Sequence, residues 1–351
     1  MSDMDVNNSH HLHGNGTDNS FLFVNQVLPV LYVLICVAGF ILNGCAAWIF
    51  FRVPSTSALV VYLKNMMVAD LLMLMSFPWK VASDLDLGGR PMKVLVCRYT
   101  AVFFYLSMYG GILFMGLISV ERYVKIVHSS AVLASSSSSS RTFCSWTSSP
   151  ACLLQQVPCA RGLAVLVWLL LQVCMLPNSI LSNQSLDPTR PWRCMALKSH
   201  LGLVWHQASS LFSVSLFWAT LLLLAFCYTS ISRRIYFSYR RTSRDGGQQA
   251  HRKSNRSIFS LLAVFFVCFV PYHVCRIPYT FSQNGAIALS PAAHAVLYQL
   301  KEGTLFLSAL NVCLDPIIYF LMCRTFRESL LLKLNAAAAA EQSRQSLSNL
   351  G

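Results

Sequence analysis

The chain has 351 residues, of which 55% are hydrophobic and only 11% are charged. Soluble domains carry roughly 25% charged residues, so a single water-soluble core of this length is excluded. The formal net charge is +14, but the basic residues lie mostly in short segments between apolar runs, as in membrane proteins, and form no exposed basic module for nucleic acid. We therefore expect the lipid bilayer as a partner and no nucleic acid.

Seven apolar runs follow one another along the chain, each long enough for the ~20 residues that a helix needs to cross a bilayer. Backbone polar groups in lipid must be satisfied within the segment, which favours helices, and the alternating pattern of a membrane β-barrel is absent. The sequence therefore predicts an all-α membrane protein, a seven-transmembrane helix bundle over residues 27–322. The runs lie near residues 27–51, 59–81, 97–127, 162–183, 204–232, 257–281 and 296–322.

The basic loops indicate the orientation of the bundle. The segment between the fifth and sixth runs is rich in Arg and Lys, and the tail after the seventh run carries Arg324, Arg327 and Lys333. Positive segments stay in the cytoplasm, so we expect residues 1–26 outside and 323–351 inside, in a multi-pass protein of the plasma membrane. Three Asn-X-Ser/Thr sequons then fall on the outer side, where glycosylation occurs. They are at Asn7, Asn15 and Asn183.

Two of the predicted cytoplasmic segments differ from the apolar runs in composition. Residues 129–160 include six consecutive serines at 135–140 and show no helical pattern, which is typical of a low-complexity loop. Over residues 324–331, basic and apolar residues recur at helical spacing, which predicts a short amphipathic helix on the inner membrane surface. The Ala-, Ser- and Gln-rich end of the chain is expected to be disordered.

Two of the thirteen cysteines stand apart. Most of the others lie inside apolar runs, where a thiol behaves as a small hydrophobe. Cys97 begins the third run and Cys194 precedes the fifth, both in polar surroundings on the oxidising side of the membrane. We therefore expect a disulfide between them, which would pin the loop over the mouth of the bundle.

Polar groups inside membrane helices are costly, so each is a candidate functional residue. A hydrated network that rearranges when the bundle changes state would explain them, and so would static hydrogen-bonded contacts between helices. Four such groups at matching depths favour the first explanation, a polar network that acts as a conformational switch. The groups are Asn43, Asp70, Asn311 and Asp315, the last followed by Pro316 and Tyr319.

Two further features belong to the same switch hypothesis. Glu121, Arg122 and Tyr123 close the third run at its cytoplasmic end, where Arg122 either couples to a partner or simply reaches the interface. Pro271 removes a backbone hydrogen bond inside the sixth run, beside Phe269, which predicts either a hinge or a static kink.

The outer mouth is rich in cations, with Tyr105, His273 and Tyr279 close by. Clustered Arg and Lys with aromatic neighbours suit an anion that carries phosphates and a stackable ring. The alternative is that several of these cations simply lie at the lipid headgroup level. This explanation fits Arg276 and Lys301 least well, because both lie within about a turn or two of the mouth. Glu302 could form a salt bridge with Lys301. The cations are Lys93, Arg98, Arg193, Lys198, Arg276 and Lys301.

Two other functional classes fit less well. An intramembrane enzyme would need a catalytic constellation such as clustered His or a Ser/His pair, which the predicted interior does not show, and the two interior aspartates are assigned to the polar network. We therefore expect neither an enzyme nor a cofactor. The runs show no inverted repeat and no pair of interrupted helices, which argues against a transporter.

As a set, these motifs resemble the rhodopsin-like (class A) G-protein-coupled receptors. A narrower resemblance, to the purinergic nucleotide receptors that answer ADP and UDP-sugars, is carried by Tyr62-Leu63-Lys64-Asn65, Arg276-Ile277-Pro278-Tyr279-Thr280 and Lys301-Glu302. Cys97-Arg98-Tyr99 and Leu197-Lys198-Ser199 are similar to an orphan member of that branch, for which lysophosphatidic acid has been proposed. The wider resemblance rests on Asn43, Val68-Ala69-Asp70-Leu71, Cys97, Glu121-Arg122-Tyr123, Trp168, Phe265-x-x-Cys268-Phe269-x-Pro271 and Asp315-Pro316-x-x-Tyr319.

The resemblance implies a receptor for an extracellular ligand that signals through an inhibitory heterotrimeric G protein. Arg276 and Lys301 would bind phosphate oxygens, Tyr105 would face the base, and Arg122 would contact the G protein. The residues that match the nucleotide pocket of the branch are Tyr105, Lys198, His206, His273, Arg276, Tyr279 and Lys301.

The chain departs from the branch at several places, of which the low-complexity loop 129–160 is the largest, and two others bear on the ligand and ion sites. Neither the first 35 residues nor residues 276–312 contain the cysteines of a second outer disulfide, which suits the orphan member better than the nucleotide-responsive ones. Gly111 stands where many relatives have a serine near Asp70, so a sodium ion at Asp70 is only a weak expectation. No other metal ion is expected. Three ligand classes remain open: nucleotide, nucleotide sugar and lysophospholipid.

Overall fold

The structure is a computed structural model that describes residues 23–52, 54–135, 154–184, 194–241, 248–283, 287 and 289–348. Seven helical stretches among them are long and apolar enough to cross a membrane, and these described residues contain no strand. The predicted seven-helix bundle is therefore confirmed. The spans are Phe23–Arg52, Ala58–Asp84, Gly89–Ile126, Val157–Ile180, His200–Arg234, Phe259–Ser282 and Pro291–Met322.

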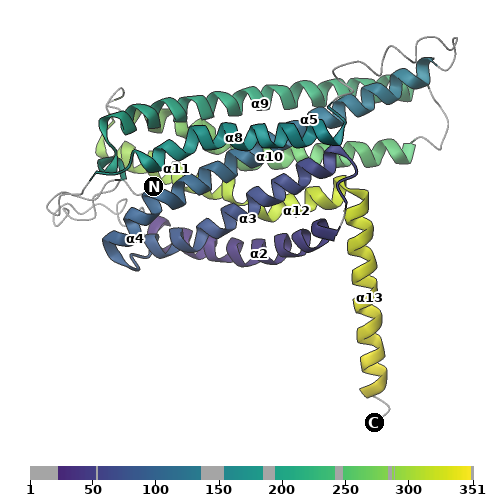
Figure 1. The fold of residues 1–351 in the computed structure, drawn as a ribbon, viewed down its shortest axis with the longest axis horizontal. Helices are drawn as coiled ribbons and strands as arrows, with labels where there is room; N and C mark the ends of the chain where they lie inside the picture. Colours follow the sequence, from purple (N-terminus) through teal and green to yellow (C-terminus); the bar gives the residue numbers. More distant parts are fainter. Residues whose placement is uncertain are drawn as a thin grey trace.

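The helices run alongside one another, and a last helix turns away from them (Figure 1). Short helical turns precede three of the helices: Phe23–Val27 before α2, Val96–Thr100 before α5, and Cys194–Leu197 before α9. The helices are α2 (Leu28–Arg52), α3 (Ala58–Asp84), α4 (Gly89–Leu95), α5 (Ala101–Ser135), α8 (Val157–Ile180), α9 (His200–Arg241), α10 (Gln248–Gln283), α11 (Pro291–Ala309), α12 (Asn311–Met322) and α13 (Arg324–Ser348).

Local sequence explains where several helices begin. The Ser57 hydroxyl accepts a hydrogen bond from the Val60 N–H at the start of α3. The Ser290 hydroxyl does the same for Ala293, and Pro291 occupies the first turn of α11. Such caps satisfy backbone donors that have no partner in the helix.

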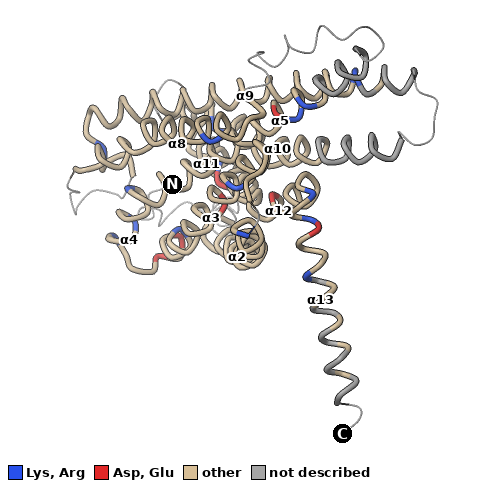
Figure 2. The backbone as a smooth tube through the Cα atoms, turned by 45° about the vertical axis from the view of Figure 1, so that its right-hand side comes forward, with Lys and Arg blue, Asp and Glu red and all other residues tan. Residues whose placement is uncertain are grey.

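The side chains of the bundle separate into an aromatic interior and an apolar outer surface. Phe50, Phe77, Phe114, Phe217 and Phe265 are fully buried. Leucine, isoleucine and valine side chains remain exposed on the spans, as lipid contact requires. Figure 2 shows that most of the described backbone carries uncharged residues and that Lys, Arg, Asp and Glu occur at only a few places.

The seventh span is interrupted, which the continuous run 296–322 did not predict. The break falls at Leu310, between α11 and α12. Pro316 lacks an N–H, so the carbonyl of Val312 loses its partner within the helix. The Asn43 amide of α2 donates to that carbonyl at 2.6 Å, and so ties α2 to α12.

The cytoplasmic segments differ from the prediction in their helical extent. α5 continues to Ser135 and α8 begins at Val157, so both ends of the predicted loop 129–160 are helical, and residues 136–153 lie outside the described part. α13 spans 25 residues, so the helix is not short and covers residues for which disorder was expected. Five consecutive alanines, residues 336–340, favour this extension because alanine has the highest helix propensity.

Candidate ligand cavity and coupling region

A cavity of about 850 Å³, partly open to solvent, lies at the outer end of the bundle. Side chains from α5, α8, α9, α10 and α11 line it, together with the turn Cys194–Leu197 and the loop residue Lys198. The structure therefore brings together six of the seven residues predicted for the ligand site. They are Tyr105, Lys198, His206, Arg276, Tyr279 and Lys301.

Arg276 is a buried cation on the α10 wall of this cavity, with 8% of its surface exposed. Its guanidinium lies 5.9 Å from the centre of the Tyr105 ring. None of the ion pairs formed among the described residues includes Arg276. A desolvated cation without a counter-ion is costly by itself and attracts an anion strongly.

Lys301 has a different environment, because it forms an ion pair with its neighbour Glu302. The predicted salt bridge is confirmed. The Glu302 carboxylate also lies 3.5 Å from the Lys80 ammonium, which in turn contacts Asp84 at 2.7 Å. The side chains of all four residues are at most 8% exposed. Two bases and two acids therefore balance one another between α3 and α11.

Lys80 of α3 is part of this network but was not singled out from the sequence. The sequence did mark Lys80 in one general way, because it is an ionisable residue inside an apolar run. The acids that neutralise Lys80 lie four residues ahead on the same helix and on a helix far away in the chain. Sequence reasoning could have found Asp84 by its spacing, but not Glu302.

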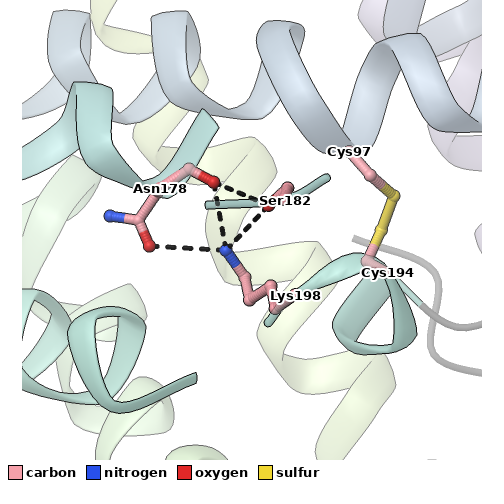
Figure 3. Close-up of a disulfide and its surroundings, with 5 residues drawn as sticks. All are labelled: Cys97, Asn178, Ser182, Cys194 and Lys198. Carbon is pink, nitrogen blue, oxygen red and sulfur yellow. Dashed lines mark hydrogen bonds between the residues drawn. A yellow bond between two sulfur atoms is a disulfide. The ribbon is translucent and has the colours of Figure 1, made fainter. Parts of the chain in front are cut away.

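Lys198 is the second cation of the cavity without an acidic partner among the described residues, and Figure 3 shows its surroundings. Its ammonium donates to the backbone and side-chain oxygens of Asn178, each at 3.4 Å, and to the Ser182 hydroxyl at 3.3 Å. All three acceptors are neutral. Burial lowers the pKa of Lys198 to about 8, so the side chain is charged at neutral pH but close to its titration range.

Asn178 organises this side of the cavity from the C-terminal part of α8. Its amide nitrogen donates to the Ser209 hydroxyl at 3.1 Å, and its amide oxygen lies 3.2 Å from His206 Nδ1. Asn178 therefore connects α8, α9 and the loop that carries Lys198. It was not among the predicted site residues, because an asparagine near a predicted span end carries no specific signal.

The predicted disulfide between Cys97 and Cys194 is present, with the two Cα atoms 5.6 Å apart (Figure 3). It fixes the turn before Lys198 to the start of the third span. Arg98, next to Cys97, donates to the Ser182 carbonyl at 2.6 Å, and Lys93 pairs with Asp86 at 2.8 Å. Neither cation lines the cavity. Both lie in the helical segments that precede α5, and Arg193 lies outside the described residues.

His273 was predicted to line the ligand site, and the structure places it beneath the cavity instead. It is fully buried and stacks on Phe217, with ring centres 3.7 Å apart. Its Nδ1 lies 2.8 Å from the Phe269 carbonyl, which can only accept, so Nδ1 carries the proton. Nε2 therefore accepts from the Tyr109 hydroxyl at 3.1 Å. Tyr109 does line the cavity and separates His273 from it.

Several of the polar residues in the middle of the bundle contact one another. The Tyr319 hydroxyl donates to Asp70, and the Asn311 amide donates to Asp315 at 3.3 Å. The carboxyl groups of Asp70 and Asp315 lie side by side. The Oδ1 atoms of Asn43, Asn311 and Asp315 are buried without a hydrogen-bond partner.

The three unpaired oxygen atoms are possible ligands for the sodium ion that was weakly expected at Asp70. Oxygen ligands suit a hard cation, and three unpaired buried oxygens leave acceptor capacity in this region. However, the Asp70 carboxylate is already bonded by Tyr319, and Gly111 supplies no hydroxyl. Within the described residues, no group of three or more His, Cys, Asp or Glu is placed to hold a metal.

Arg122 links the cytoplasmic ends of two helices. Its Nη2 donates to the Met322 carbonyl at the end of α12 at 2.7 Å, and its Nε lies 3.8 Å from Glu121. Arg122 and Met322 line a small inner pocket with Tyr228 of α9 and Leu261 of α10. Tyr123 packs on Phe226 with ring centres 5.6 Å apart. Arg122 therefore bonds to the bundle and does more than reach the membrane interface.

Comparison with known proteins agrees with this arrangement. Residues 42–319 match the sequence profile of the family described as "7 transmembrane receptor (rhodopsin family)". This chain belongs to that rhodopsin family of receptors. It is a multi-pass receptor of the plasma membrane with an extracellular N-terminus, and it is not an enzyme. Its partners are a heterotrimeric G protein and a small extracellular ligand.

Relatives of the receptor include several purinoceptors. Purinoceptor 14 of Bos taurus is 45% identical over 314 residues, which cover 90% of this chain and 87% of that protein. G-protein coupled receptor 87 of Mus musculus is 42% identical over 339 residues, with coverage of 97% and 88%. Purinoceptor 13 of Homo sapiens is 36% identical over 307 residues, with coverage of 88% and 81%. The receptor is accordingly of the purinergic type.

Proposed function

We propose that this receptor binds an extracellular nucleotide or nucleotide sugar in its outer cavity and signals through an inhibitory G protein. The observation that carries the proposal is the pair of cations without acidic partners among the described residues, Arg276 and Lys198, on a cavity with aromatic walls. The names of the relatives, purinoceptors 14 and 13, point to the same ligand class.

The ligand phosphates would lie near Arg276, because guanidinium binds phosphate oxygens in pairs and with good geometry. Lys198 would approach from the loop, where its neutral partners leave its charge available. Lys301 would attract phosphate less, since Glu302 already neutralises it. Tyr105 and Tyr279 would face the base or sugar.

Activation requires that the ligand favours one arrangement of the bundle over another. Contacts to Tyr109 and Arg276 would act on α10, because Tyr109 bonds to His273, and His273 bonds to the carbonyl of Phe269, two residues before Pro271. At the inner end, release of the bond between Arg122 and the Met322 carbonyl would free Arg122 for the G protein. Asp70 and Tyr319 would rearrange with Asp315 and Asn311 between these two ends.

A direct test reconstitutes the purified receptor with inhibitory, stimulatory and Gq-type heterotrimers and measures ligand-stimulated nucleotide exchange. ADP, a UDP-sugar and lysophosphatidic acid are supplied in separate assays. We expect stimulation by ADP or the UDP-sugar, on the inhibitory heterotrimer. Stimulation by lysophosphatidic acid alone would replace the proposed ligand by a lysophospholipid, and selective exchange on another heterotrimer would overturn the coupling.

We also propose N-glycosylation of the outer segments. Asn183 is exposed after the end of α8, whereas Asn7 and Asn15 lie outside the described residues. Enzymatic removal of N-glycans should lower the apparent mass of the receptor from cells. An unchanged mass would contradict glycosylation at all three sites.

A further inference from the structure

Two cations and one aromatic ring meet at the cytoplasmic corner between α2 and α13. The guanidinium of Arg52, the last residue of α2, lies 4.5 Å from the centre of the Trp48 ring. The ammonium of Lys333, on α13, also lies over that ring. Phe50 and Phe326 hold the two helices together here, with ring centres 5.0 Å apart.

Neither cation has an acidic partner among the described residues. Arg52 takes part in none of the ion pairs, and the Nζ atom of Lys333 is buried without a hydrogen-bond partner. Desolvation and repulsion by Arg52 both lower the pKa of Lys333. Arg324, at the start of the same helix, differs because it pairs with Glu328 at 2.6 Å. The corner therefore holds uncompensated positive charge.

The position of the corner matches the inner boundary of the membrane. Arg52 ends the first span, and α13 begins directly after the last span, which ends at Met322. Phe51 beside Arg52 is 82% exposed and Leu332 beside Lys333 is 71% exposed. Exposed apolar side chains next to Trp and basic residues are typical of the level where acyl chains meet headgroups.

We propose that Trp48, Arg52 and Lys333 form a binding site for the headgroup of an anionic phospholipid of the cytoplasmic leaflet. The lipid phosphate would accept hydrogen bonds from the guanidinium and the ammonium. Its acyl chains would extend along Phe51 and the outer surface of α2. The anionic lipids of this leaflet provide the counter-charge that the protein lacks here.

Lipid competition on the purified full-length receptor tests this site. Native mass spectrometry measures the ratio of phosphatidylserine to phosphatidylcholine, with identical acyl chains, in the first lipid that the receptor retains. The wild type should favour phosphatidylserine. Arg52→Gln and Lys333→Gln should each lower that preference about fivefold, and the double variant roughly thirtyfold.

Arg324→Gln is the matched control, because it removes a cation of α13 that already has an acidic partner. It should keep the wild-type preference, as should the conservative double variant Arg52→Lys, Lys333→Arg. A preference that falls equally in Arg324→Gln and Lys333→Gln would overturn the site, since only the overall charge would then matter. Displacement of the bound phosphatidylserine by excess inorganic phosphate would also overturn it, in favour of a site for free anions.

Discussion

The guanidinium of Arg276 lies 5.9 Å from the centre of the Tyr105 ring without an acidic partner in the described part of the chain. Lys301, on the same cavity, is neutralised by Glu302. The resemblance to the nucleotide receptors assigned both cations to phosphate binding, but among the described residues only Lys301 has an acidic partner that competes with a ligand. Their substitutions should therefore have different consequences.

Arg276→Gln should reduce the potency of the activating ligand by roughly 10- to 150-fold, which corresponds to the ~1.5–3 kcal/mol of a hydrogen bond to a charged group. Concentration–response curves for G-protein activation measure this change, at surface levels matched by antibody labelling. Lys93→Gln is the control, since Lys93 pairs with Asp86 outside the cavity. Equal potency of the wild type and Arg276→Gln would remove Arg276 from the ligand site.

Lys301→Ala should mainly destabilise the receptor. The substitution leaves the buried Glu302 with Lys80 alone, at 3.5 Å, and the loss of one partner from a buried ion pair costs up to about 3–5 kcal/mol. Thermal unfolding in detergent should show a lower midpoint for Lys301→Ala. The double variant Lys301→Met, Glu302→Gln should recover most of the loss, because Lys80 still has Asp84. No recovery would show that Glu302 is not the source of the defect.

Binding of the anion should weaken as the pH rises from 7 to 9. Lys198 has a pKa of about 8, so its charged fraction falls from roughly nine tenths to one tenth over this range. Phosphate, with its second pKa near 6, stays ionised throughout, so the change in affinity reports on the protein. Lys198→Arg keeps its charge and should abolish the dependence. A pH profile that is unchanged in Lys198→Arg would assign the titration to another group.

His273 and Tyr109 should act as one unit. Tyr109→Phe and His273→Phe each remove the same hydrogen bond, worth about 1 kcal/mol. Their effects on the potency of G-protein activation should therefore not add, with an interaction energy of about 1 kcal/mol in a double-mutant cycle. Additive effects would show that His273 acts independently of Tyr109, for example through direct ligand contact.

The outer disulfide should be required for folding. Cys97→Ser or Cys194→Ser should lower surface expression strongly, because loss of a native disulfide typically costs about 2–5 kcal/mol. Cys275→Ser, at a free cysteine on α10, serves as the control and should reach the surface normally. Normal surface levels of Cys97→Ser would mean that the bond contributes little to stability.

The global fold could be predicted because lipid imposes simple rules on the sequence. Length and apolar content mark the seven spans, and a cysteine at the start of the third span and another before the fifth mark the disulfide. The pair Lys301–Glu302 could be expected because adjacent opposite charges in an apolar run have few other partners.

The remaining features depend on contacts between distant segments, which no local pattern specifies. Glu302 approaches Lys80 from another helix, and Asn43 bonds to the carbonyl that Pro316 leaves unpaired. His273 was expected in the cavity because it lies near the outer cations and matches a pocket position of the nucleotide receptors, but the tertiary packing directs it toward Phe217. The extent of α13 was underestimated, because its polar composition suggested disorder while its alanines favour a helix.

Direct binding of a nucleotide or nucleotide sugar and of its dephosphorylated nucleoside, to purified wild-type and Arg276→Gln receptor, tests the phosphate site most directly. We predict that the wild type binds the phosphate-bearing ligand at least about tenfold more tightly than the nucleoside, and that Arg276→Gln removes most of this difference. Equal affinity of the wild type for both ligands would contradict phosphate recognition by the outer cavity.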